Sequence, residues 1–127
     1  MLAYSDPGEA YRRSEVDARI RSARPEQLVT MCCEQVSVGI GSAIAAELRG
    51  DATARSRGLT RALSALTALE MGVDRNQPLA DVLTNMYANA KRAILDNVVS
   101  FDRPTLDQVR TDFAELSEVF ASLKHGA

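Results

Sequence analysis

The sequence predicts an all-α fold, an antiparallel up-down four-helix bundle with a short N-terminal helix or cap segment. Apolar residues recur at spacings of three and four nearly throughout, and no stretch alternates with the period of a half-buried strand. Proline and glycine divide this pattern into four long segments. Because the connections between them are short, successive helices should be antiparallel neighbours.

The length and composition indicate a single globular domain. The chain has 127 residues, of which 46 % are apolar and 25 % charged, which is ordinary for one folded domain. We expect a partly flexible cap segment over 1–24, the bundle over 25–124 and a short tail over 125–127.

The first two long helices are bounded by clear signals. The first is predicted over 25–49, because Pro25 suits the first helical position and Gly50 is a natural left-handed terminator. The second is predicted over 52–71, and the turn-forming residues 72–77 follow it. The pattern therefore predicts a tight first connection and a longer second one.

The last two helices are predicted from proline 78 to about residue 100 and from about proline 104 onward. The expected apolar stripe of the third helix is Leu79, Val82, Leu83, Met86, Ala90, Ile94 and, more weakly, Val98. The fourth helix has an unbroken seam of alternating threes and fours, typical of a bundle helix: Leu106, Val109, Phe113, Leu116, Phe120 and Leu123.

The first long helix has an unusually wide apolar surface. With each residue turning 100°, its apolar arc covers roughly 160°, whereas a bundle helix usually needs a little over 100°. Either the helix is central and packed on both flanks, or part of the arc is an open groove for a partner helix. Both explanations are compatible if the N-terminal segment, with Tyr11, Val16 and Ile20, is a cover that a partner can displace. The third helix shows a milder excess, with Leu95 and Val99 off its main stripe.

Three glycines, Gly39, Gly41 and Gly58, fall inside predicted helices. Each costs about 1 kcal/mol relative to alanine in a helix interior. They are explained either by close helix packing or by room for a partner to approach.

The sequence lacks the usual combinations of residues for catalysis or metal binding. His125 is the only histidine, and Cys32 and Cys33 are adjacent and have Glu34 beside them, an unfavourable neighbourhood for a reactive thiolate. The sequence has no Gly-rich phosphate-binding motif. We expect no enzyme activity, no metal and no cofactor.

Charge and hydropathy restrict the partners and the compartment. The net charge of −2 argues against a nucleic-acid partner. No run of about 18 apolar residues occurs, so we expect no membrane insertion. Residues 1–10 lack the pattern of a signal peptide. Adjacent cysteines cannot staple distant segments, and the expected compartment is the reducing cytoplasm.

An ordered set of motifs resembles the FliS family of flagellar secretion chaperones. Tyr11 and Val16 have the spacing of the family's N-terminal Tyr-x-x-x-x-Val. The segments similar to family helices are Ser22-Ala-Arg-Pro-Glu-Gln-Leu-Val-Thr-Met31, Leu59-Thr-Arg-Ala62 and Leu83-Thr-Asn-Met-Tyr87, followed by Asp102 before the last helix. The chain departs from the family pattern at Cys32-Cys33-Glu34-Gln35, at Asn97-Val98 and at Phe120, where a tryptophan is common.

The resemblance implies a chaperone that binds the disordered C-terminal region of flagellin in the cytoplasm, prevents premature polymerisation and keeps the subunit competent for type III secretion. It also suggests the flagellar export apparatus as a second partner. The expected partner surface has Tyr11 and Val16 as cover and a groove of four residues: Val29, Ile40, Ile44 and Tyr87. Two alternatives stay open: an adaptor for a different secreted subunit, and a structural bundle whose broad apolar face makes a homodimer.

Overall fold

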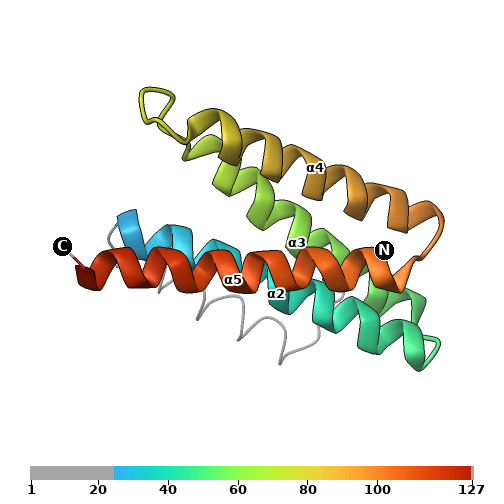
Figure 1. The fold of residues 1–127 in the computed structure, drawn as a ribbon. Coiled ribbons are helices and arrows are strands. Elements are labelled where there is room, and N and C mark those ends of the chain that lie inside the picture. Colours follow the sequence, from blue (N-terminus) through green and yellow to red (C-terminus); the bar gives the residue numbers. More distant parts are fainter. Residues whose placement is uncertain (1–24, 127) are drawn as a thin grey trace, which may run out of the picture.

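The computed structural model describes residues 25–126, and side-chain surroundings for residues 27–122, as a bundle of four antiparallel helices (Figure 1). The helices are α2 (Pro25–Leu48), α3 (Ala52–Met71), α4 (Ala80–Val99) and α5 (Arg103–Gly126). This confirms the predicted all-α four-helix fold. The predicted cap segment, residues 1–24, lies outside the described residues.

Helix α2 is the central element of the bundle. It packs extensively on both α3 and α5, whereas α4 packs mainly on α3 and much less on α5. Its fully buried side chains include Cys33, Val36, Ile40 and Ala43, each 0 % exposed. The wide apolar arc of α2 is therefore largely explained by packing on two flanks, the first of the two explanations considered above.

Helices α2 and α3 approach each other closely at two glycines. A Cβ atom added at Gly39 would lie 2.7 Å from the carbonyl oxygen of Gly58, and one added at Gly58 would lie 2.6 Å from the carbonyl oxygen of Gly39. Ala43 and Ala62, one turn further along each helix, are also at the contact. Small residues thus bring the two backbones together and increase dispersion contacts between them.

Turn chemistry fixes the α2–α3 connection. Gly50 has a φ of +73°, so it is the left-handed terminator that the sequence predicted. Asp51 then caps α3, because its side chain accepts a hydrogen bond from the backbone N–H of Ala54 at 3.0 Å. Across the same turn, Arg55 of α3 forms an ion pair with Glu47 of α2.

The α4–α5 turn is held by the side chain of Asn97, which is only 3 % exposed. Its amide donates to the carbonyl oxygen of Ala93 at 2.8 Å, and its oxygen accepts from the backbone N–H of Asp102. The guanidinium of Arg55 lies 5.9 Å from the ring centre of Phe101 in the same turn. This end of the bundle is thereby closed by polar and cation–π contacts.

The predicted face of α4 was partly wrong. The helix begins at Ala80 rather than at proline 78, because Gln77 and Ala80 close a turn just before it. Leu79, Val82 and Val98, assigned to the apolar stripe, are 62 %, 61 % and 55 % exposed. Ala90 and Ile94 of the predicted stripe are buried, and Leu83 and Met86 are partly buried against the core, whereas Ala80, Tyr87 and Asn97 are buried without having been assigned to it. Several faces of α4 carry apolar residues, so apolar spacing identified the middle of the buried face but not its two ends.

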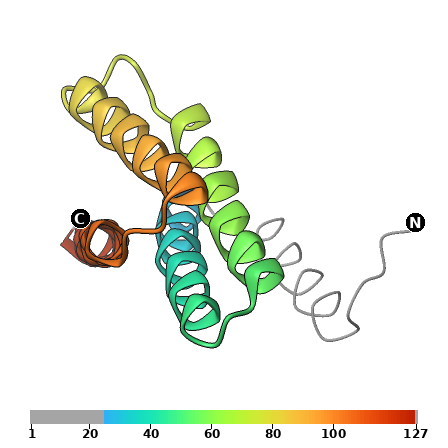
Figure 2. The same ribbon diagram turned by 90° about the vertical axis from the view of Figure 1, so that its right-hand side faces the viewer.

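The seam of α5 agrees with the prediction. Leu106, Val109 and Phe113 are at most 9 % exposed. Leu116 and Phe120 are half-buried against the core, and Leu123 lies beyond the described side chains. Figure 2 shows α5 nearly end-on while the other helices remain extended, so α5 crosses the rest of the bundle at an angle.

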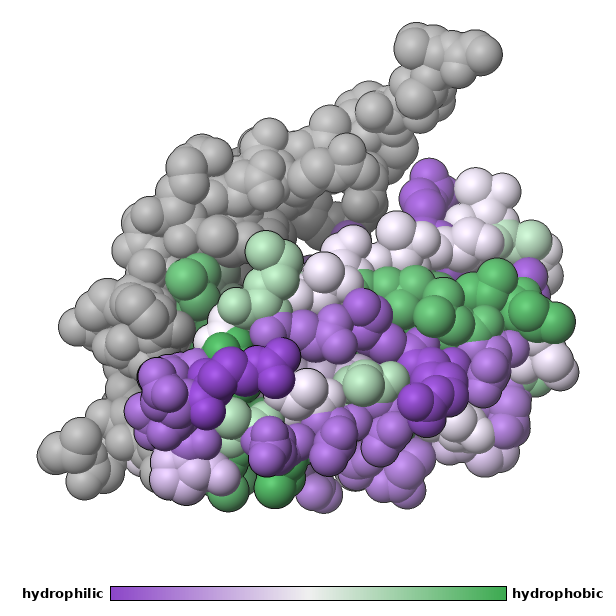
Figure 3. All heavy atoms as spheres, turned by 90° about the horizontal axis from the view of Figure 1, so that it is seen from above, coloured by the Kyte–Doolittle hydropathy of each residue, from purple (hydrophilic) through white to green (hydrophobic). Residues whose placement is uncertain are grey.

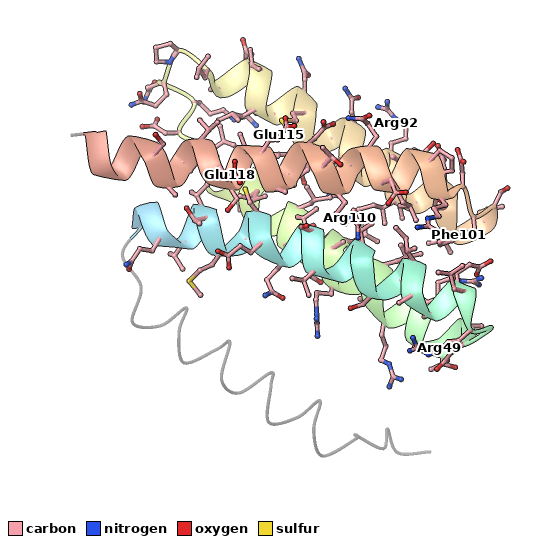
Figure 4. All side chains as sticks on the ribbon, turned by 60° about the horizontal axis from the view of Figure 1, so that its bottom comes forward. Arg49, Arg92, Phe101, Arg110, Glu115 and Glu118 are labelled. Carbon is pink, nitrogen blue, oxygen red and sulfur yellow. The ribbon has the colours of Figure 1, made fainter. Side chains whose placement is uncertain are left out.

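We predict that Gly39→Ala destabilises the protein by about 1–2 kcal/mol, because overpacking against the α3 backbone outweighs the gain in helix propensity. Gly41→Ala is the matched control. Its Cβ would meet only the flexible side chain of Arg110, at 3.4 Å, which reaches from α5 toward α2 (Figure 4). Urea unfolding of both variants measures the difference, and an equal or greater stability of Gly39→Ala than wild type would contradict the role of this contact.

Candidate apolar binding pocket

Helices α4 and α5 meet at the turn that joins them and diverge toward the other end of the bundle (Figures 1 and 2). At this divergent end lies a pocket of about 420 Å³, within the range of volumes usual for ligand-binding sites. Each of the four helices contributes to its wall. The pocket is therefore a consequence of the uneven packing of α4 on α3 and α5.

The lining of the pocket is almost entirely apolar. Side chains at the start of α2 and the end of α3 form one part of the wall: Leu28, Val29, Cys32, Ala68, Leu69 and Gly72. The following loop, the start of α4 and the end of α5 complete it: Val73, Asp74, Gln77, Ala80, Leu83, Tyr87 and Phe120. Such a surface suits apolar side chains of a partner rather than a polar metabolite.

Tyr87 joins the pocket to the core. Its side chain is 2 % exposed, and its ring centre lies 6.1 Å from that of Phe113 on α5, a usual separation for an aromatic pair. Burial raises the pKa of the phenol to about 12, and the neighbouring Cys33 and Cys32 add to the effect. The hydroxyl is therefore protonated and uncharged at neutral pH.

Neither thiol near the pocket is activated. Burial raises the pKa of Cys33 to about 12, with Cys32 and Glu34 contributing less. Burial also raises the pKa of Cys32, which is half-buried in the pocket wall. Since the thiolate is the reactive form, both cysteines act at neutral pH as packing residues.

The structure separates the predicted site residues into three groups. Val29 and Tyr87 are brought together in the pocket wall from α2 and α4. Ile40 and Ile44 belong instead to the buried core, at 0 % and 5 % exposure, so a partner cannot contact them without displacing neighbouring side chains. Tyr11 and Val16 lie outside the described residues.

Two other pocket residues, Leu83 and Phe120, were assigned from the sequence to the apolar stripes of the third and fourth helices. Leu69, Val73, Leu83 and Phe120 all have helical spacing that is typical of core positions. What distinguishes them is the divergence of α4 from α5, a tertiary feature with no local signal. The polar loop 72–77 was recognisable as a turn, but its place at the pocket mouth was not.

A second apolar surface lies on α4 near the closed end of the bundle. Leu95, Val98 and Val99 are 52 %, 55 % and 89 % exposed, which agrees with the prediction that Leu95 and Val99 lie off the main stripe. Seen from above, apolar surface forms a strip at this end of the molecule (Figure 3). The pocket lies toward the other end of α4, where Ala80, Leu83 and Tyr87 line its wall.

The described residues offer no group of three or more His, Cys, Asp or Glu side chains that could hold a metal ion. One segment of them, Gln27–Leu48, is long and apolar enough to cross a membrane by length and composition alone. The core helix of a globular protein passes the same test, and this segment is the central helix α2. Its apolar character therefore follows from its position between α3 and α5.

We predict that the thiols of the folded protein react slowly with a disulfide reagent at pH 8, because their raised pKa values keep the thiolate fraction small. Cys32→Ser isolates Cys33, which should stay unlabelled until the protein is unfolded in urea. The reverse variant, Cys33→Ser, reports Cys32 in the pocket wall. Rapid stoichiometric labelling of Cys33 in the folded protein would contradict its burial.

The comparison with protein families identifies the chain. Residues 7–127 match the family described as flagellar protein FliS, which covers nearly the whole sequence. No curated protein sequence matches the chain significantly. The family match agrees with the four-helix fold and with the ordered motifs found in the sequence. This chain belongs to the FliS family and is thus a member of a family of flagellar export chaperones.

Proposed function

We propose that this protein is a cytoplasmic chaperone that binds the disordered C-terminal region of flagellin. It would prevent premature polymerisation and keep the subunit competent for type III secretion. The observation that carries the proposal is an apolar pocket built from the ends of all four helices in a chain of the FliS family.

The chemistry of the pocket suits a segment that folds when it binds. An induced helix presents apolar side chains on one face, and such side chains are complementary to an apolar cavity between helices. Ordering the segment costs a few kcal/mol of the gross interaction energy, so binding stays weak enough for release at the export apparatus. Of the four groove residues expected from the sequence, Val29 and Tyr87 line this pocket, and we propose that they contact the client.

The N-terminal segment is proposed as a displaceable cover, with Tyr11 and Val16 as its apolar contacts. A cover that occupies the same surface as the client lowers the apparent affinity by the fraction of molecules in which it is bound. The same surface could be used by a different secreted subunit or by a second copy of the chain, and the client experiments below distinguish these alternatives.

We predict that Val29→Asp weakens binding of the flagellin C-terminal region by tenfold or more, because it places a carboxylate in the apolar wall. Val38→Asp is the matched control, since Val38 is on the same helix, does not line the pocket and is already 47 % exposed. Isothermal titration of purified protein with flagellin gives both affinities, and thermal unfolding shows whether each variant is folded.

Three outcomes would contradict the proposal. Equal loss of binding in the two variants would remove the pocket from the client surface. Binding of another secreted subunit in preference to flagellin would change the client. A wild-type protein that runs as a dimer in gel filtration and binds no flagellin would favour the structural bundle.

Deleting residues 1–16 is expected to leave the helical circular dichroism of the bundle intact and to raise the affinity for flagellin several-fold, because the competing cover is removed. The double variant Tyr11→Ser, Val16→Ser in the full chain should have the same effect with the chain length unchanged. Unfolding of the truncated protein, or an unchanged affinity in both cases, would refute the cover.

A further inference from the structure

The part of the pocket lining that the structure describes includes a single charged side chain, that of Asp74. Among the described residues that line the pocket, only Asp74 carries a formal charge, and the rest of the wall is apolar apart from Gln77 and the Cys32 and Tyr87 side chains. Asp74 stands in the loop between α3 and α4 and is exposed to solvent. An apolar cavity with one negative charge at its edge favours a ligand that has an apolar group and a positive charge close together.

The carboxylate of Asp74 is held in place by its own loop. One oxygen, Oδ1, accepts a hydrogen bond from the backbone N–H of Asn76 at 3.0 Å, and the other, Oδ2, accepts a longer one from the amide of Gln77 at 3.4 Å. The orientation of the charge is thus largely fixed before any partner arrives. Preorganisation of this kind reduces the entropic cost of a contact.

No cation of the described residues neutralises Asp74. The acidic side chain near the end of α3 is paired, because Glu70 lies 2.8 Å from Lys91. The hydrogen bonds of Asp74 come only from neutral groups. Within residues 27–122, the carboxylate of Asp74 forms no ion pair, not even with Arg75 beside it in the loop, so the pocket mouth has a negative charge directly beside an apolar surface.

We propose that the pocket selects a client segment in which an apolar anchor residue stands next to a lysine or arginine. The anchor enters the cavity, and the basic side chain pairs with Asp74 at the rim. The inference rests on the proposed function and adds the chemistry that the client must carry. If the bound segment is helical, the two residues are neighbours in sequence or three or four positions apart, because those positions share a face.

The test uses the full-length protein and the C-terminal region of flagellin from the same organism. Asp74→Asn keeps an oxygen that accepts from Asn76 but removes the charge, and Asp74→Lys reverses it. Glu115→Lys is the matched control, since Glu115 is exposed on α5 and does not line the pocket (Figure 4). We expect Asp74→Asn to lower the affinity about threefold and Asp74→Lys about tenfold at low salt, with Glu115→Lys close to wild type.

Salt and a reciprocal substitution in the client sharpen the result. The difference between wild type and Asp74→Lys should shrink between ionic strengths of about 0.01 M and 1 M, where the Debye length falls from about 30 Å to 3 Å. Among flagellin variants with single basic residues changed to glutamate, one should bind Asp74→Lys better than it binds wild type. A double-mutant cycle on that pair would identify the anchor position.

Three results would overturn the inference. Equal losses of affinity in Asp74→Lys and Glu115→Lys would show that binding depends on the overall charge of the protein and not on a contact with Asp74. The proposed function would still stand in that case, because the wild type binds the client. Tighter client binding by Asp74→Lys would mean that a basic residue on the client does not pair with this carboxylate. Absence of any flagellin binding by the wild type would instead remove the proposed function, and this inference with it.

Discussion

The close contact between α2 and α3 at Gly39 and Gly58 is the constraint on which the rest of the bundle depends. It fixes α3 along one flank of the central helix and leaves the other flank to α5. Helix α4 is then held chiefly through α3, with Lys91 and Glu70 as one of the links. Since α4 has little contact with α5 away from their common turn, the bundle opens at its far end, and the pocket is the result.

The two ends of the molecule consequently differ in their chemistry. At one end, polar side chains complete the turns: Asn97 joins α4 to the start of α5, and Arg55 contacts both Glu47 and the ring of Phe101. At the other, four helix ends converge on apolar side chains and leave a cavity. Fixed structure and an open binding surface are thus separated along the bundle axis, so that a change at the pocket need not disturb the turns.

Much of the fold could be predicted because its signals are local. Gly50 and the seam from Leu106 to Phe113 depend on backbone conformation and periodicity, and the structure has them as predicted. On α4, the burial of Ala90 and Ile94 was predicted, but the first turn was not, because Leu79 and Val82 compete with Ala80 for the stripe and only tertiary packing decides between them.

The candidate site was predictable only in part, for a similar reason. Val29 and Tyr87 were expected at the partner surface and do line the pocket, whereas Ile40 and Ile44 are buried beneath neighbouring helices. An apolar arc on one helix says how much surface is covered, but not whether another helix or a client covers it. That distinction depends on crossing angles and on the divergence of α4, which no single segment encodes.

A cavity built from all four helix ends also makes the stability of this protein a measure of its occupancy. A ligand that binds only the assembled pocket stabilises the folded state by mass action, by about 2.7 kcal/mol when its free concentration is a hundred times the dissociation constant. A chaperone that has delivered its client loses that contribution at once. The empty protein would then open more readily at its divergent end, and its resistance to heat and proteolysis would change with each cycle of loading and release.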